Sequence, residues 1–145
     1  MAAPTTGSLG IILDSSILVA FERRRFDLER FLTNQAPPAI AAITAAELLI
    51  GVERADTPER RKRRESFVQS IFDRVPIIPF EMTQARLFAV HFADLATRGE
   101  IIGDRDLQIA ATALSLDFDL ATLNEGEFSR VTGLRLASVS AYITS

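Results

Sequence analysis

Several carboxylates in this sequence lie near the ends of short apolar runs, where together they could hold a divalent cation. Asp14 directly follows the run at residues 9–13, and Glu127 comes shortly after the run at 119–122. Carboxylate and amide oxygens are the ligands that Mg²⁺ and Mn²⁺ prefer. Such an ion can lower the pKa of a bound water and stabilise charge on a phosphodiester during its displacement. The residues of suitable type are Asp14, Glu47, Asp106, Asn124 and Glu127.

The apolar runs alternate with segments that have the pattern of amphipathic helices. This alternation predicts an α/β fold with a parallel sheet covered by helices on both sides. The expected strands are residues 9–13, 39–43, 75–79, 119–122 and 134–137. The expected helices cover residues 17–21, 26–32, a segment that begins at Thr44, and 106–116. Two further helices have local signals: one is capped by Thr57 with Pro58 in its first position, and Met82–Thr97 is closed by Gly99. We see no repeat and no linker, and expect a single domain over 1–145 with a flexible segment at 1–8.

A parallel sheet would bring the polar residues to one edge, because sites in such sheets form beyond the carboxyl ends of the strands. Asp14 ends the first expected strand, and Glu47 lies in the first turn of the helix after the second. Asp106 opens the helix before the fourth strand, which Asn124 and Glu127 follow. Carboxylates crowded together repel and raise one another's pKa values, and a divalent cation removes that cost.

Each of these residues also has a purely structural explanation. Thr44 and Glu47 have the spacing of a capping box, in which Glu47 bonds back to the Thr44 backbone. Asp14 is a residue type that caps helices. The others have types that are common at helix starts, in turns and in loops: Asp104, Asp106, Asn124 and Glu127. Only their common location favours the functional interpretation.

Composition excludes other kinds of site. The chain has no cysteine and one histidine, which excludes disulfides, thiolate sites and His-rich zinc sites. The net charge of −3 counts mildly against nucleic acid as a substrate, although a cluster of metal-binding carboxylates also lowers the charge. No apolar run approaches the roughly 20 residues that span a bilayer, and residues 1–10 do not have the pattern of a signal peptide. We therefore expect a soluble, cytoplasmic protein that does not bind a membrane.

Four blocks of the sequence resemble the motifs of PIN domains. Residues 11–16 resemble an apolar strand followed by Asp-x-Ser, and residues 43–48 resemble the Thr-x-x-Glu-Leu segment. Residues 102–111 contain Asp-Leu-x-Ile-Ala-Ala, and residues 120–128 resemble Thr-x-Asn-x-x-Asp/Glu-Phe. One block would mean little. Four blocks in the family's order and spacing are similar to the VapC toxins of bacterial toxin–antitoxin pairs.

The resemblance implies a three-layer α/β/α fold with a central, mostly parallel sheet of about five strands. It also implies a Mg²⁺- or Mn²⁺-dependent endoribonuclease, the toxin of a type II toxin–antitoxin system, which cleaves RNA and inhibits translation. The implied partners are a VapB-like antitoxin and a second copy of the chain, in a homodimer.

The motif match also implies roles for individual residues. The implied catalytic acids are Asp14, Glu47, Asp106 and Glu127. The implied metal ligands among them are Asp14, Glu47 and Asp106. The residues implied to support the site are Ser16, Thr122 and Asn124, the last as a polar neighbour or a ligand.

Some assignments beside the motifs stay open. The motif spacing selects Asp106, and Asp104 is interpreted as an N-cap or an outer-shell residue that could join the metal site. Glu125 competes with Glu127 for the position of the fourth acid. Arg105 adjoins Asp106 and is expected to touch a substrate phosphate or an inhibitor.

Two basic runs, residues 23–25 and 60–64, could guide RNA. Glu59 and Glu65 flank the second run, so a solvated helix face with local ion pairs is the favoured interpretation there. His91 lies among apolar residues of the expected helix Met82–Thr97, where a structural role is favoured. Ser15 and Leu123 stand where the family commonly has threonine and arginine or asparagine, which bears on the substrate more than on the chemistry.

Other functions also fit an acidic sheet edge. A Mg²⁺-dependent phosphatase or phosphotransferase places an Asp after the first strand, but its Asp-x-Asp signature is absent because Ser15 and Ser16 follow Asp14. A receiver-like domain, or a PIN-like domain that only binds RNA or protein, needs no catalysis. Cleavage of RNA with and without a divalent metal, beside a phosphatase assay, separates these alternatives.

Overall fold

The computed structural model describes residues 8–145 and contains there a four-stranded parallel sheet with the strand order β3-β2-β1-β4. The strands are β1 (Ile11–Leu13), β2 (Pro38–Ala41), β3 (Ile77–Ile78) and β4 (Asp119–Ala121). All of β1 is buried, which explains why it is apolar throughout rather than alternating. The predicted flexible segment at residues 1–8 lies outside the described residues, except for Ser8.

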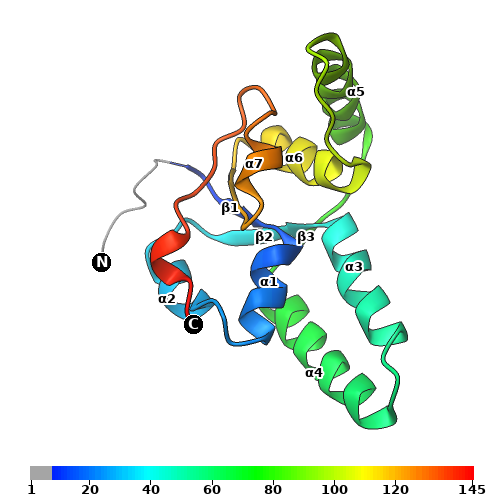
Figure 1. Ribbon diagram of the computed structural model, residues 1–145, viewed down its shortest axis with the longest axis vertical. Helices are drawn as coiled ribbons and strands as arrows, with labels where there is room; N and C mark the ends of the chain where they lie inside the picture. The colour runs from blue at the N-terminus through cyan, green and yellow to red at the C-terminus, as the bar shows by residue number, and fades with distance from the viewer. Residues whose placement is uncertain (1–7) are drawn as a thin grey trace.

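Helices cover both faces of this sheet, so the domain has three layers (Figure 1). Side chains alternate along a strand, and Ile11 and Leu13 therefore join one core while Ile12 joins the other. The first core is covered by α1 (Ser15–Glu22), α2 (Leu28–Thr33), α3 (Ala42–Glu53) and α4 (Pro58–Arg74). The second is covered by α5 (Met82–Thr97), α6 (Asp104–Leu116) and the short α7 (Glu125–Phe128). The predicted α/β/α architecture is confirmed.

The sheet has one strand fewer than expected. Between residues 8 and 145, the segment 134–137 makes a single parallel bridge, from Leu136 to Leu120 of β4. Leu120 N–H donates to the Arg135 carbonyl (2.9 Å), and Ala137 N–H donates to the Leu120 carbonyl (2.8 Å). These two bonds use both backbone groups of Leu120. Because β4 has only three residues, its outer edge offers little more to pair with.

The starts of α3 and α6 also differ from the predictions. The helix α3 begins at Ala42, directly after β2, and its N-cap is Ala41. Thr44 therefore lies inside the helix rather than capping it, so the alternative of a capping box with Glu47 is wrong. The helix α6 begins at Asp104 with Gly103 as its N-cap, so Asp104 is not the cap. Alanine-rich sequence around residue 42 supports a helix without a polar cap.

Other predicted helix signals are confirmed. The Thr57 hydroxyl accepts a hydrogen bond from Arg60 N–H (3.1 Å), and Pro58 is the first residue of α4. The helix α5 has the predicted bounds Met82–Thr97, and Gly99 follows it with φ of +69°. Over the part of the chain that the structure describes, no helix is both long and apolar enough to cross a bilayer.

Gly10 allows the first strand to pack closely against the sheet's edge. A Cβ at Gly10 would overlap the ring of Phe118, which packs against the second core. The Gly10 carbonyl also accepts a hydrogen bond from Asp119 N–H (3.1 Å), and this bond aligns β4 with β1. We expect Gly10→Ala to lower the free energy of unfolding by about 1–3 kcal/mol, because the ring must move in a packed interior. Urea unfolding followed by circular dichroism measures this.

Gly51 is a matched control for that substitution. It lies within α3, and a Cβ there would meet no atom within 4 Å. Gly51→Ala should raise the free energy of unfolding by about 0.5–1 kcal/mol, because alanine has the higher helix propensity. Equal unfolding midpoints for Gly10→Ala and the unchanged protein would mean that the Phe118 ring is free to move.

Candidate active site

The carboxyl ends of the two neighbouring strands β1 and β4 bring Asp14 next to the loop after β4. Asp14 N–H donates to the Ala121 carbonyl (2.9 Å), and α1 begins one residue later. The Asp14 side chain is almost entirely buried and, within the described chain, does not cap α1. Its Oδ2 instead accepts hydrogen bonds from Ser16 Oγ (2.6 Å) and Thr122 Oγ1 (2.8 Å).

The same two hydroxyls hold the loop that follows β4. Leu123 N–H donates to Ser16 Oγ (3.0 Å), and Asn124 N–H donates to Thr122 Oγ1 (2.9 Å). This network therefore sets the direction of the Asp14 carboxylate and the path of residues 122–124 together. The geometry is that of a supported carboxylate, which is the role that the sequence predicts for Ser16 and Thr122.

Asp106 lies in the first turn of α6 and faces other acids. Partial burial, a hydrogen bond with the Glu127 carboxyl, and the negative charges of Asp14, Glu127 and Glu47 raise the pKa of Asp106 to about 7. The predicted acids from four different segments are thus close enough to affect one another's ionisation.

Glu47 reaches this group from α3, the helix after β2. Burial raises the pKa of Glu47, the positive charge of Arg105 opposes that shift, and the charge of Asp14 adds to it. Arg105 Nη1 lies 3.8 Å from Glu47 Oε2. Glu47 Oε1 is buried, and no group in residues 8–145 forms a hydrogen bond with it. This side chain therefore has a coordinating oxygen that its protein neighbours leave unused.

The competing acids are placed differently. Glu125 and Glu127 both lie on α7, but Glu125 is exposed, whereas Glu127 is half-buried and contributes to the raised pKa of Asp106. Asp104 is exposed at the start of α6 and is not among the causes of the Asp106 pKa shift. Asn124 is the N-cap of α7, and its backbone rather than its side chain makes the hydrogen bond described above.

The oxygen ligands that these acids offer are of the type that binds a divalent cation. In residues 8–145, however, no three acidic side chains already lie close enough together to form a metal site. Two observations support the fit. The free Oε1 of Glu47 offers an oxygen ligand, and a cation could replace the proton that Asp106 retains because its pKa is raised. The ligands would all be oxygens, as Mg²⁺ and Mn²⁺ prefer.

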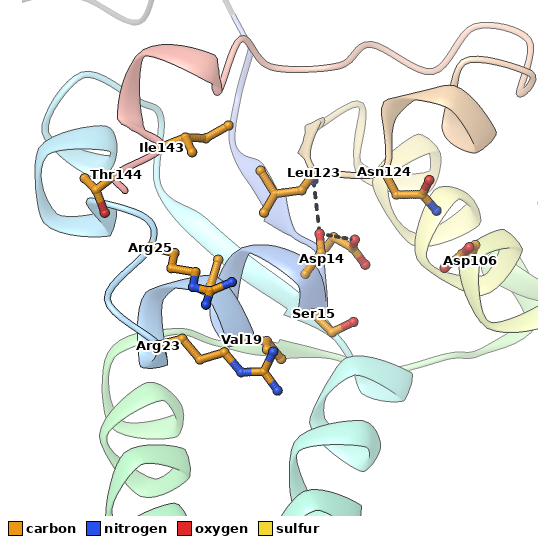
Figure 2. A pocket seen from close by; sticks show the side chains of 12 residues that line it. Asp14, Ser15, Val19, Arg23, Arg25, Asp106, Leu123, Asn124, Ile143 and Thr144 are labelled. Carbon is orange, nitrogen blue, oxygen red and sulfur yellow. Dashed lines mark hydrogen bonds between the residues drawn. The ribbon is translucent and has the colours of Figure 1, made fainter.

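A pocket of about 580 Å³ opens beside these acids (Figure 2). Asp14, Asp106 and Asn124 line one end, whereas Arg23 and Arg25 lie on the other side in the view of Figure 2. The remaining lining residues are Ser15, Ser16, Val19, Ala20, Leu123, Ile143 and Thr144. Sequence reasoning did not place the C-terminal residues Ile143 and Thr144 here, and nothing in their residue types indicates it.

The second basic run does not line this pocket. Arg60 pairs with Asp56 (2.7 Å), and Arg61 pairs with Glu53 (2.8 Å) and Glu65 (3.0 Å). This agrees with the favoured interpretation of a solvated face with local ion pairs. Arg64 lines a smaller neighbouring pocket of about 280 Å³, which Glu47 also lines. His91 lies on α5 and does not line either pocket.

Fold, motifs and acidic edge together define a known class of domain. The family model of the PIN domain matches residues 11–134. The chain therefore belongs to the PIN-domain family, as its four sequence blocks predict.

Its relatives include VapC proteins. The chain is 32% identical over 133 residues to Ribonuclease VapC1 of Rickettsia felis. This alignment covers 92% of this chain and 98% of the relative. It is 33% identical over 107 residues to the tRNA(fMet)-specific endonuclease VapC of Shigella flexneri, covering 74% and 79%. The crystal structure of DNA-bound VapBC from Salmonella typhimurium matches with a TM-score of 0.80 and 27% identity, covering 89% of this chain and 97% of that chain.

Proposed function

We propose that this protein is a divalent-metal-dependent endoribonuclease and the toxin of a type II toxin–antitoxin system. The observation that carries the proposal is that four carboxylates lie near the carboxyl edge of the sheet, where the charges of Asp14, Glu127 and Glu47 add to burial in raising the pKa of Asp106. The similarity to Ribonuclease VapC1 over 92% of this chain supports RNA as the substrate. The likeness to VapBC complexes supports a VapB-like antitoxin as the partner.

In the proposed mechanism, Asp14, Glu47 and Asp106 hold the metal, and Glu127 and Asn124 complete the pocket. When bound, the ion supplies an activated water and stabilises charge on the RNA phosphodiester. The hydroxyls that bond to Asp14 keep its carboxylate in one orientation. Arg105, beside Glu47, is exposed and can contact a substrate phosphate.

We also propose that the chain acts in the cytoplasm and forms a homodimer. Large apolar side chains on and beside α5 are exposed, namely Phe80, Met82, Val90, Phe92 and Ile101. A second copy would remove this surface from water. Light scattering of the purified protein measures its mass, and a monomer at micromolar concentration would contradict the homodimer.

The test of the nuclease is cleavage of cellular RNA by protein freed of any co-purified antitoxin. We expect discrete fragments with 5′-phosphate ends in Mg²⁺ or Mn²⁺, and none in EDTA. Initiator tRNA should be among the substrates tested, because the Shigella relative is named for it. Hydrolysis of p-nitrophenyl phosphate without RNA cleavage would favour a phosphatase. RNA binding without cleavage under any metal would favour a non-catalytic module.

A further inference from the structure

Two arginines in the pocket wall, Arg23 and Arg25, form no ion pair with any residue in the described part of the chain. The side chains of Arg23 and Arg25 are exposed at the end of α1, and within residues 8–145 neither forms a hydrogen bond or an ion pair. In Figure 2 both extend toward the pocket. By contrast, Arg60 and Arg61 on α4 are paired with acids. An anion that enters the pocket can therefore bind two guanidinium groups without displacing a protein partner.

Two large apolar side chains form the wall beside these arginines. Leu123 is 40% exposed and Ile143 is 52% exposed, and both line the pocket. Their backbones are held in place, since Leu123 N–H bonds to Ser16 Oγ (3.0 Å) and Ile143 bridges to Phe26. An apolar surface that is fixed and open to water favours a flat apolar ligand such as a nucleobase.

The arrangement of charge and apolar surface selects the occupant. Acids lie at one end of the pocket, and Arg23 and Arg25 lie at the other. Leu123 and Ile143, which come from segments far apart in sequence, also line the pocket. A nucleotide has a phosphate for the arginines and a base face for the apolar wall. The volume of about 580 Å³ falls within the range of small-ligand pockets. A stacked base in a duplex could not reach this wall, so the RNA must be single-stranded here.

We propose that Arg23, Arg25, Leu123 and Ile143 form a subsite for one nucleotide of single-stranded RNA adjacent to the acidic centre. The arginines bind its phosphate, and the two apolar side chains pack against its base. This inference rests on the proposed ribonuclease function and adds to it the residues that select an unpaired nucleotide. Because the Leu123 and Ile143 side chains would contact the base rather than the phosphate, they would contribute to the choice of base.

The phosphate part is tested by fluorescence anisotropy in EDTA, where cleavage is not required. Arg23→Ala combined with Arg25→Ala should weaken binding of a single-stranded RNA by roughly tenfold or more. The dependence of log affinity on log salt should become shallower by about 0.7, as expected when one phosphate of a single strand is no longer neutralised. Arg24→Ala is the matched control, since Arg24 is exposed between them and does not line the pocket. It should change the affinity less than twofold.

The apolar part is tested with an abasic strand of the same length. The unchanged protein should bind the strand with bases about fivefold more tightly. Leu123→Ala with Ile143→Ala should abolish this difference, whereas Leu9→Ala, an exposed leucine outside the pocket, should preserve it. Circular dichroism checks that each variant is folded.

The outcomes separate this subsite from the nuclease itself. RNA cleavage by the wild type, with equal binding by the double arginine variant and Arg24→Ala, would overturn the subsite and leave the nuclease. Loss of binding in the double variant, without cleavage by the wild type, would support the subsite and overturn the nuclease. Unchanged RNA binding with lost binding of a decaglutamate peptide would assign the arginines to an acidic protein partner and overturn the proposal.

Discussion

Asp14→Asn is expected to reduce RNA cleavage by more than about 100-fold while leaving the fold intact. Both hydrogen bonds to the Asp14 carboxylate converge on Oδ2, from Ser16 and Thr122. An asparagine can place its carbonyl oxygen at that point and keep both bonds. Its NH₂ group then occupies the position of Oδ1, where it offers neither a negative charge nor a lone pair to a cation. The measurement is the initial rate of RNA cleavage in Mg²⁺, with circular dichroism as the check on folding.

Asp119 provides a control of the same chemical type. It is as buried as Asp14, but it pairs with Arg135 (2.8 Å), which also pairs with Asp117 (2.8 Å). Asp119→Asn should lower the free energy of unfolding by about 1–3 kcal/mol and leave cleavage within about twofold at a temperature where the protein is folded. Full cleavage by Asp14→Asn, or an equal loss in both variants, would contradict the assignment of Asp14 to the metal site.

Local sequence patterns predict the elements whose signals lie within a few residues. Thr57 with Pro58 marks the start of α4, and the helix Met82–Thr97 ends before Gly99 as expected. The position of the acids follows from a general property of parallel sheets, because the carboxyl ends of strands share an edge. This is why the sequence alone predicts that Asp14, Glu47 and Asp106 lie at the same edge.

The features that sequence patterns did not predict depend on contacts between distant segments or on weak local signals. The start of α3 at Ala42 has no polar cap to mark it, so Thr44 was the stronger local signal. The turn of helix α7 contains Gly126 and resembles a loop in sequence, yet it decides that Glu127 rather than Glu125 meets Asp106. The C-terminal wall of the pocket depends on the bridge between Ile143 and Phe26, for which the sequence carries no local signal.

Asp106→Asn is expected to abolish cleavage and, in the absence of metal, to stabilise the protein at pH 8. The pKa of Asp106 is raised from 3.8 to about 7, first by burial and then by the neighbouring acids. Between about pH 4 and pH 7 the folded protein keeps a proton that the unfolded chain has lost. The contribution of Asp106 to stability therefore falls as the pH rises through that window and is least above pH 7. Because an asparagine does not ionise, the Asp106→Asn variant does not lose stability in this way as the pH rises.

A divalent cation should reverse the order of stability at pH 8. Binding to ionised Asp106 and its neighbours stabilises the folded wild type by mass action. The Tm of the wild type should thus rise on addition of Mg²⁺, while that of Asp106→Asn should change little. Cleavage by the variant should fall by more than about 100-fold. Thermal melts at pH 5 and pH 8, each with EDTA and with Mg²⁺, measure these effects.

Asp104→Asn separates the role of the Asp106 carboxyl from a general effect of charge on α6. Both residues lie in the first turn of this helix, where a carboxylate interacts favourably with the helix dipole. Asp104 is exposed and does not contribute to the pKa shift of Asp106, so its substitution should preserve cleavage and the Mg²⁺-dependent rise in Tm. If Asp106→Asn changed Tm equally at pH 5 and pH 8, the Asp106 carboxyl would titrate normally, which would contradict its raised pKa. A gain in stability at pH 8 together with lost cleavage would instead show that these crowded acids lower the stability of the fold and are retained because they bind the metal.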